Sequence, residues 1–385
     1  MQRKTRLVSI ALRASLLACC GFAAAAARAD DDQGPFLPRF VVSSTIPANG
    51  DLNPYGVVIA PKDFPAGGKI APGDVLVSNF NNSSNAQGTG VTIIKLTPTG
   101  PVAPSVSPGQ SGSATTFFTS KLIGLTTALG LLKVGFVVVG NLPATNSGIG
   151  QGSLQVIDRK GNLVTTLTDA TFLGSPWDLT INDGGAHTQV FVSNVLQGTV
   201  ARIDLAVGPG GVSVKTENEI AKGYGHKTDP VAFVLGPTGL AYDKDADVLY
   251  VASTLDNAIY AVPAAGTRTT PVDKGKLVFA DPHLRGPLAL ALAPNDDLIT
   301  ANGDAVNPDP GHPSEIVEFT KDGKFIRESN IDAGQGGAFG IAVLRHSRPF
   351  NFAAVDDNAN NVTVFAVRSH FEGDSDETAA APTTK

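Results

Sequence analysis

Six short apolar runs of this sequence each end on a small polar side chain that can hydrogen-bond to another molecule. In chain order these residues are Asn79, Asn141, Asn194, Ser253, Asn302 and Asp356. Such side chains offer donors and acceptors to a polar ligand without filling a pocket. They also cap strands and bond the backbone of turns, which is the commoner use of a single Asn or Asp. The recurrence predicts a polar, ligand-binding rim, and the capping role stays open for each residue.

The loop of residues 303–314 holds a second set of side chains, which could bind a metal ion. His312 lies close in sequence to Asp304, Asp309 and Glu315. Imidazole and carboxylate groups are ligands of divalent cations. We therefore include His312 as a candidate metal ligand, with calcium or magnesium as the ion. The alternative is a solvated loop that binds nothing.

Other motifs lack parts that their chemistry needs. Residues 243–247 begin like a calcium loop, but Val248 stands where that loop needs glycine and Thr254 where it needs its closing glutamate. Residues 109–113 miss the last glycine of a nucleophile elbow. The glycine-rich residues 208–211 lack the lysine of a phosphate loop. No motif indicates a nucleotide.

The elements that must position these groups are short strands. The stretch Gly236 to Pro263 contains three apolar runs separated by Asp- and Asn-rich turns. Runs of this length between such turns are typical of half-buried antiparallel strands. Helical periodicity is nearly absent, and residues 115–132 are the one weak exception.

The same pattern returns six times along the chain. Each unit opens on a motif like Pro237-Thr238-Gly239-Leu240, continues to one of the six polar residues above, and adds a third strand. The other openings begin at Pro54, Ala128, Pro176, Pro287 and Ala338. Because a second antiparallel strand ends where the first begins, the openings, the six polar residues and the long loops 80–90, 142–152 and 303–314 should share one face. Loops on a rigid scaffold are frequent binding sites, although solvated loops are equally common.

Six units of this kind predict an all-β, six-bladed β-propeller formed by residues 30–370. Fourth strands are expected at 115–119, 163–167, 212–216, 276–280 and 325–328. The sixth unit has no fourth strand of its own, so the strand-like residues 40–44 should complete that blade and close the ring, hiding an open edge. Residues 371–385 are acidic and are expected to be a disordered tail.

The repeated sequence Pro-x-Gly-Leu-Ala, then Leu-Tyr-Val-Ala-Ser, then Asn-x-Ile-Tyr resembles the NHL-repeat propellers and the wider regucalcin and gluconolactonase-like superfamily. The resemblance covers nearly all of the chain after its first residues. It implies the propeller fold. The superfamily includes lactonases, lyases and binding scaffolds, so the fold alone assigns no activity.

The resemblance also implies where a metal would lie. Lactonase-type members bind a metal in the channel through a glutamate and Asn or Asp residues near the starts of the innermost strands. Here the matching starts offer Asp178 as the one ligand, and aromatic and apolar residues otherwise, including Tyr55 and Phe339. This departure puts a metal-dependent lactonase in doubt and predicts a narrowed or plugged channel. Trp177 is interpreted as a core residue or as a stacking platform for a ligand.

The first 29 residues have the features of a secretory signal peptide: a basic start, an apolar segment and Ala27-Arg28-Ala29 before an acidic run. We expect cleavage after Ala29 in preference to lipidation at Cys19, and no transmembrane segment in the mature chain. Both cysteines lie in this segment, so the mature chain would have no disulfide and no thiolate site.

Removal of the segment's five basic residues would change the formal net charge from −6 to −11. An acidic surface argues against nucleic acid as a partner. We therefore expect a secreted or periplasmic, monomeric binding or interaction module whose long-loop face contacts a small ligand or an envelope protein. The alternative is a metal-dependent lactonase, hydrolase or lyase, so the sequence leaves open whether the chain is an enzyme.

Overall fold

In a computed structural model the described residues are 39–98, 113–344 and 352–365, and they belong to one unit, Phe36–Lys385. Every regular element in this part of the chain is a β-strand. None of it forms a helix of the length and apolarity needed to cross a bilayer. The predicted signal peptide and acidic tail lie outside the described residues.

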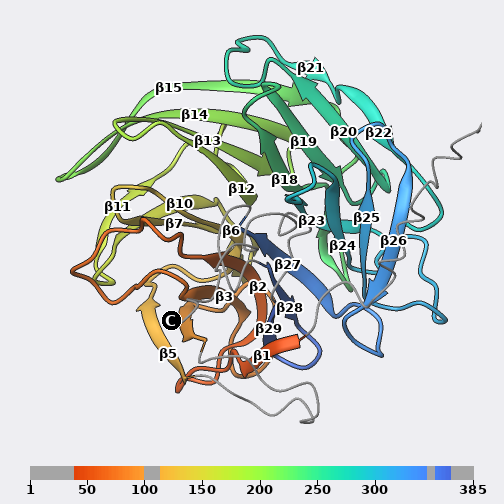
Figure 1. Ribbon diagram of the computed structural model, residues 1–385. Coiled ribbons are helices and arrows are strands. Elements are labelled where there is room, and N and C mark those ends of the chain that lie inside the picture. Colours follow the sequence, from red (N-terminus) through yellow and green to blue (C-terminus); the bar gives the residue numbers. More distant parts are fainter. Residues whose placement is uncertain (1–38, 99–112, 345–351, 366–385) are drawn as a thin grey trace, which may run out of the picture. The chain divides into compact units, whose positions relative to one another are not determined.

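Six sheets form a ring of blades, which confirms the predicted six-bladed β-propeller (Figure 1). In blades 1 to 3 the strands, from the innermost outward, are β2 (Leu52–Ile59), β3 (Val75–Asn81), β4 (Thr92–Thr97) and β5 (Ser113–Thr119); β6 (Leu125–Leu131), β7 (Phe136–Asn141), β10 (Ser153–Asp158) and β11 (Leu163–Leu167); and β12 (Pro176–Asp183), β13 (His187–Asn194), β14 (Thr199–Gly208) and β15 (Gly211–Lys222) with β21 (Val272–Asp273) added in parallel.

Blades 4 to 6 follow the same order. Their strands are β18 (Pro237–Asp243), β19 (Val248–Ser253), β20 (Ala258–Pro263) and β22 (Lys276–Phe279); β23 (Pro287–Leu292), β24 (Leu298–Asn302), β25 (Glu315–Phe319) and β26 (Phe325–Asn330); and β27 (Ala338–Val343), β28 (Phe352–Asp356), β29 (Asn361–Phe365) and β1 (Arg39–Ser44). Two small ribbons, β8 (Ala144–Thr145) with β9 (Gly148–Ile149) and β16 (Lys227–Asp229) with β17 (Phe233–Leu235), lie between blade strands in the sequence.

The hydrophobic core lies between blades rather than within one sheet. Each of six apolar clusters joins two neighbouring blades, and in one of them Val41 of β1 packs with Val362 and Val364 of β29 and with residues of blade 1. The second strands of the blades are thus covered on both faces, which is why runs such as Val75–Asn81 and Phe136–Asn141 are buried throughout. The outer strands, such as β11, are partly exposed.

The ring is closed by the strand at residues 39–44, as the sequence predicted. β1 pairs antiparallel with β29 from Arg39 opposite Phe365 to Ser44 opposite Asn361. The contact continues beyond the strand, because the Thr45 amide donates to the Asn360 carbonyl at 2.9 Å. This pairing covers what would otherwise be an open sheet edge.

The fourth strand expected at residues 115–119 is confirmed as part of β5, and β6 follows it, so the weak helical periodicity of residues 115–132 belongs to strands. One local prediction was wrong, because the opening of the second unit was misplaced. Leu125, not Ala128, pairs with Asn141, so the motif beginning at Ala128 is not the start of the unit. In that blade the break in register contains one more residue than in the other blades, and the unit opens with Leu125-Thr126-Thr127.

Each innermost strand has the same break in its pairing with the second strand. In blade 1 the register shifts between Pro54 and Val57, and corresponding shifts occur in the other five blades. Two opposing strands of unequal residue number make a β-bulge, which redirects side chains and often occurs next to functional sites.

Candidate functional site

The channel mouth at the starts of the innermost strands is filled by aromatic side chains, here called the aromatic plug: Tyr55, Phe80, Trp177 and Phe339. The Tyr55 ring stacks between Phe80 and Phe339, with centroid separations of 4.5 and 4.1 Å. Trp177 packs edge-on against Phe80 at 5.4 Å. Tyr55 and Trp177 are each 2% exposed. Trp177 is therefore a core residue in this structure, which is one of the two interpretations that the sequence allowed.

A cover of two loops and a ribbon lies over the plug. Phe233 of the β16–β17 ribbon packs edge-on against Phe80 at 5.2 Å. The Ala144 amide donates to the Gly88 carbonyl at 2.9 Å, which joins the loops of residues 80–90 and 142–152. Gln87 donates to the carbonyl of Val231 at 3.0 Å. Val231, at the ribbon tip, is 81% exposed, so the cover presents an apolar residue to solvent.

The predicted rim amides are buried at the bases of the loops. In blades 1, 2, 3 and 5 the amide nitrogen donates to a backbone carbonyl just before the first strand of the same blade: Asn79 to Thr45, Asn141 to Ile123, Asn194 to Phe172 and Asn302 to His283, at 2.7 to 3.2 Å. Each bond fixes the end of a second strand to the entry of the first. This arrangement is the capping role that the sequence analysis left open, and the ligand-binding role of these residues stays a prediction.

The two remaining rim residues bond within their own turns. The Ser253 hydroxyl donates to Asp256 at 2.7 Å, and Asp356 accepts from the Ala359 amide at 3.1 Å. Burial raises the pKa of Asp356 to about 6, and the neighbouring Asp332 contributes. Burial, with Asp356 nearby, raises the pKa of Asp357 to about 8. The end of β28 thus holds carboxyl groups that take up protons more readily than usual.

His312 stays at the surface with Asp309. Its ring is 57% exposed and lies 3.0 Å from the Asp309 carboxylate, which raises the pKa of the imidazole. Asp309 also lies 3.3 Å from Arg285, whose guanidinium is 3.2 Å from the buried Glu315. Asp304 instead accepts from the backbone amides of Ser314 and Gly336. Asp309 and Glu315 therefore share Arg285, whereas Asp304 holds the backbone of the loop.

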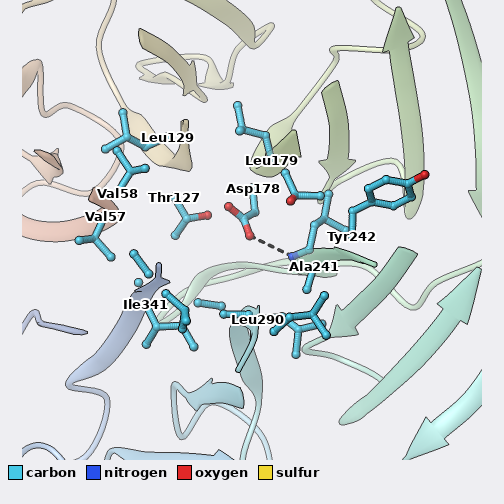
Figure 2. Close-up of a pocket in the computed structure, with 18 residues that line it drawn as sticks. Val57, Val58, Thr127, Leu129, Asp178, Leu179, Ala241, Tyr242, Leu290 and Ile341 are labelled. Atoms are coloured by element: carbon cyan, nitrogen blue, oxygen red, sulfur yellow. Dashed lines mark hydrogen bonds between the residues drawn. The ribbon is translucent and has the colours of Figure 1, made fainter. Parts of the chain in front are cut away.

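A cavity of about 270 Å³ occupies the channel beyond the plug, because its lining residues follow the plug residues along the innermost strands. Figure 2 shows the residues that line it. All six innermost strands line it, through residues that lie within or after the bulges. Most of the walls are Val, Leu, Ile and Ala side chains. Asp178, the residue after Trp177, is the acidic group in the lining.

Asp178 occupies a position that small residues hold in most other blades. Its equivalents are Gly56, Gly239, Ala289 and Gly340. A Cβ on Gly340 would come within 2.0 Å of the Tyr55 carbonyl oxygen of the next inner strand, so the ring leaves no room for a side chain there. At Asp178 the carboxylate instead reaches the next inner strand and accepts from the Leu240 amide at 3.0 Å.

The apolar walls determine the protonation of Asp178. Although the side chain is partly exposed to the cavity, desolvation raises its pKa from the ordinary 3.8 to about 8, against the lowering effect of the Leu240 and Leu179 amides. At neutral pH the carboxyl is therefore mostly uncharged. A neutral carboxyl can donate one hydrogen bond as well as accept others.

The channel residues do not fit a divalent metal ion. Calcium takes six to eight oxygen ligands and magnesium six, several of them carboxylates or water. Asp178 is a single, mostly protonated carboxyl among hydrocarbon side chains. Among the described residues no three or more His, Cys, Asp or Glu side chains are arranged to hold a metal. The metal-ligand roles predicted for Asp178 and His312 are not joined in one site, because His312 lies in a surface loop and does not line the cavity.

Sequence reasoning missed Thr127, which lines the cavity and donates through its hydroxyl to the Trp177 carbonyl. The misplaced opening of the second unit concealed it, since Thr127 precedes the motif that was matched. The signal that finds it is the pairing of Leu125 with Asn141. With that register, Leu125 takes the place of Pro176, and Thr127 lies in the bulge that corresponds to Trp177 and Asp178.

Replacing Asp178 by Asn should change how stability depends on pH. The folded state holds the Asp178 proton more tightly than the unfolded state between pH 3.8 and about 8. The contribution of this group to stability is therefore fully present below pH 3.8 and is lost as the pH rises through 8. Relative to wild type, Asp178→Asn should gain unfolding free energy over this interval, by at most about 1.4 kcal/mol per pH unit. Urea unfolding from pH 4 to 9 measures this, and parallel curves for the two proteins would contradict it.

Comparisons with known proteins support the fold and nothing finer. No family model and no curated protein matches the chain. A gluconolactonase from Xanthomonas campestris is similar in structure: 11% of residues are identical, 86% of this chain and 98% of that chain are covered, and the TM-score is 0.50. A streptogramin B lyase (14% identity, 88% and 90% covered) and the calcium-binding protein regucalcin from Agrobacterium tumefaciens (13%, 85% and 94%) match with a TM-score of 0.47 each.

Proposed function

We propose that this chain is a secreted or periplasmic β-propeller that binds a partner through its loop face, formed by the loops of residues 80–90, 142–152 and 303–314. The aromatic plug carries the proposal. Because Tyr55 and Trp177 fill the channel mouth on this face, the loops present a surface rather than a deep pocket. A surface of this kind suits a protein or a glycan better than a small molecule held in a cleft.

The contacts beneath the loops support a preformed surface. The loops of residues 80–90 and 142–152 are joined by the bond between Ala144 and Gly88, and the loop of residues 303–314 is held by Arg285 through Asp309. In this proposal the rim amides, such as Asn79 and Asn302, orient the loop bases rather than contact the partner themselves. A preformed surface loses less conformational entropy on binding than mobile loops would.

The alternative function is a metal-dependent lactonase, hydrolase or lyase. Its support is the fold shared with a gluconolactonase, at an identity of 11%. The inner-strand starts, where such enzymes would need metal ligands, carry Tyr55, Trp177 and Phe339 in the plug. The channel's Asp178 lies on the other side of this plug. The binding module is therefore the better-supported proposal.

Metal ions should not change the thermal stability of the purified protein. A ligand that binds only the folded state raises apparent stability, by about 2.7 kcal/mol at a hundred times its dissociation constant. We expect the melting temperature to stay within about 1 °C after chelation and on addition of calcium, magnesium, manganese or zinc. Differential scanning calorimetry provides the measurement. A saturable rise with one ion would favour the enzyme.

Binding itself is tested by a comparison of the two faces. One variant replaces residues 82–87 by alternating Gly and Ser, which removes the Gln87 contact and alters the loop face. The control, Lys244→Ala, changes an exposed residue of the turn between β18 and β19 on the opposite face. Both proteins are assayed against an array of glycans and against purified envelope proteins. The proposal expects a partner of the wild type to be lost by the loop variant and kept by the control; equal loss, or none, would contradict it.

A further inference from the structure

The walls of the channel cavity specify most of what it can accept. Leu129, Leu179, Leu240, Leu290 and Ile341 come from five different inner strands and present hydrocarbon to the space. At about 270 Å³ the cavity is slightly smaller than the usual range for drug-sized ligands, which begins near 300 Å³. An occupant must therefore be small, with a hydrocarbon part that packs against these side chains.

The polar end of the cavity is Asp178, directly beneath the plug. One of its oxygens accepts from the Leu240 amide at 3.0 Å, and the side chain is partly exposed to the cavity. In a hydrocarbon environment an uncharged carboxyl is far less costly than a carboxylate. Its hydroxyl is then a donor, and the leucine and isoleucine side chains of the lining offer it no acceptor. The other polar side chains of the lining are Thr127, Thr180 and Tyr242, and the hydroxyl of Thr127 already donates to the Trp177 carbonyl.

From this geometry we propose that the channel cavity is a binding site for a small, uncharged, mainly apolar molecule that bears a carbonyl or ether oxygen, with Asp178 donating a hydrogen bond to that oxygen. The site lies on the other side of the aromatic plug from the loop face, so it is separate from the proposed partner surface. It needs no metal. The oxygen of the ligand satisfies the carboxyl, and the ligand's hydrocarbon part packs against the leucines.

The charge of the ligand distinguishes this proposal from the alternative ligand, an apolar amine. A protonated amine would favour ionised Asp178 and would bind better as the pH rises toward the pKa of the carboxyl. A carbonyl ligand needs the protonated form and should bind worse. The other titratable residue of the described lining is Tyr242. Burial and the hydrogen bond to Asp247 raise the pKa of its phenol, so Tyr242 stays neutral at the pH values at which Asp178 titrates.

The experiment compares three probes of similar size by calorimetric titration: cyclohexanone, methylenecyclohexane and cyclohexylamine. Wild-type protein should bind cyclohexanone most tightly at pH 6.5 and at least about tenfold more weakly at pH 9.5, because there only a few per cent of a group with pKa near 8 is protonated. Methylenecyclohexane lacks the acceptor and should bind weakly at both values. Tighter binding of cyclohexylamine, or equal binding of cyclohexanone and methylenecyclohexane, would overturn the proposal.

Three variants connect the binding to this cavity. Asp178→Asn keeps a donor and an acceptor without ionising, so its affinity for cyclohexanone should be independent of pH. Asp178→Ala should bind cyclohexanone no better than methylenecyclohexane. Ala289→Leu should fill the space and abolish binding of every probe. If Ala289→Leu binds cyclohexanone as the wild type does, or if no probe binds the folded wild type, the cavity is not the site proposed.

Discussion

Replacing Trp177 by Ala is expected to lower the free energy of unfolding by about 3–5 kcal/mol, the usual cost of truncating a large buried aromatic side chain. Trp177 is 2% exposed and contacts both Tyr55 and Phe80, with ring centroids at 5.7 and 5.4 Å. Three inner-strand starts meet in this plug. Its loss would therefore weaken the packing of several blades at once.

The measurement is urea unfolding followed by circular dichroism, since Trp177 is the only tryptophan and its fluorescence disappears in the variant. Trp177→Phe is the matched control. It keeps an aromatic ring in the plug and removes an indole nitrogen that is buried with no hydrogen-bond partner, so it should cost less than half as much as Ala. A loss below about 1 kcal/mol in the Ala variant would mean that the plug does not stabilise the ring.

Deleting residues 36–45 should reduce stability by at least about 3 kcal/mol and cause self-association. Burial of Val41 alone is worth about 1.5–3 kcal/mol, and the deletion also removes the pairing with β29 and the carbonyl of Thr45 that accepts from Asn79. The exposed edge of β29 would be free to pair with another chain.

Light scattering after gel filtration, together with urea unfolding, measures both effects of this deletion. Removal of residues 371–385 is the control, because those residues lie beyond every described strand. This control should unfold like the wild type and should have the same number of chains per particle. If the protein that lacks residues 36–45 is monomeric and unfolds like the wild type, β1 does not hold the ring closed. Val41→Asp tests the same contact without shortening the chain.

The repeating strands could be predicted because each blade is built from local patterns. Alternating apolar runs with Asp- and Asn-rich turns recur through the chain, and second strands end at the expected residues in blades such as those of Asn141 and Asn302, whereas β3 runs past Asn79 to Asn81. In the second blade a local motif points to the wrong start. Ala128 to Leu131 copies the motif better than the true start at Leu125, and only pairing with Asn141 identifies the register.

The candidate site could be predicted only in part. Asp178 and Trp177 were singled out by residue type, but the cavity is assembled from six strands that are far apart in sequence, and no local pattern reveals its volume. At His312 the neighbours in sequence meet only in part. Asp309 lies 3.0 Å from the His312 ring and also contacts Arg285, whereas Asp304 accepts from the backbone amide of Ser314. The contact with Arg285 joins residues 24 positions apart, so no local pattern predicts it.

The closing strand also has a consequence for how the chain folds. The amide of Asn53 bonds the side chain of Asn360, 307 residues away, and β1 pairs with β29 at a similar separation. Closing a flexible loop of this length costs about 5 kcal/mol of chain entropy, compared with about 2 kcal/mol for a ten-residue loop. The five preceding blades can form from local contacts, but the last waits for the two distant ends to meet. Ring closure should therefore be a late step in folding, and a chain interrupted before β29 would leave its first strand unpaired.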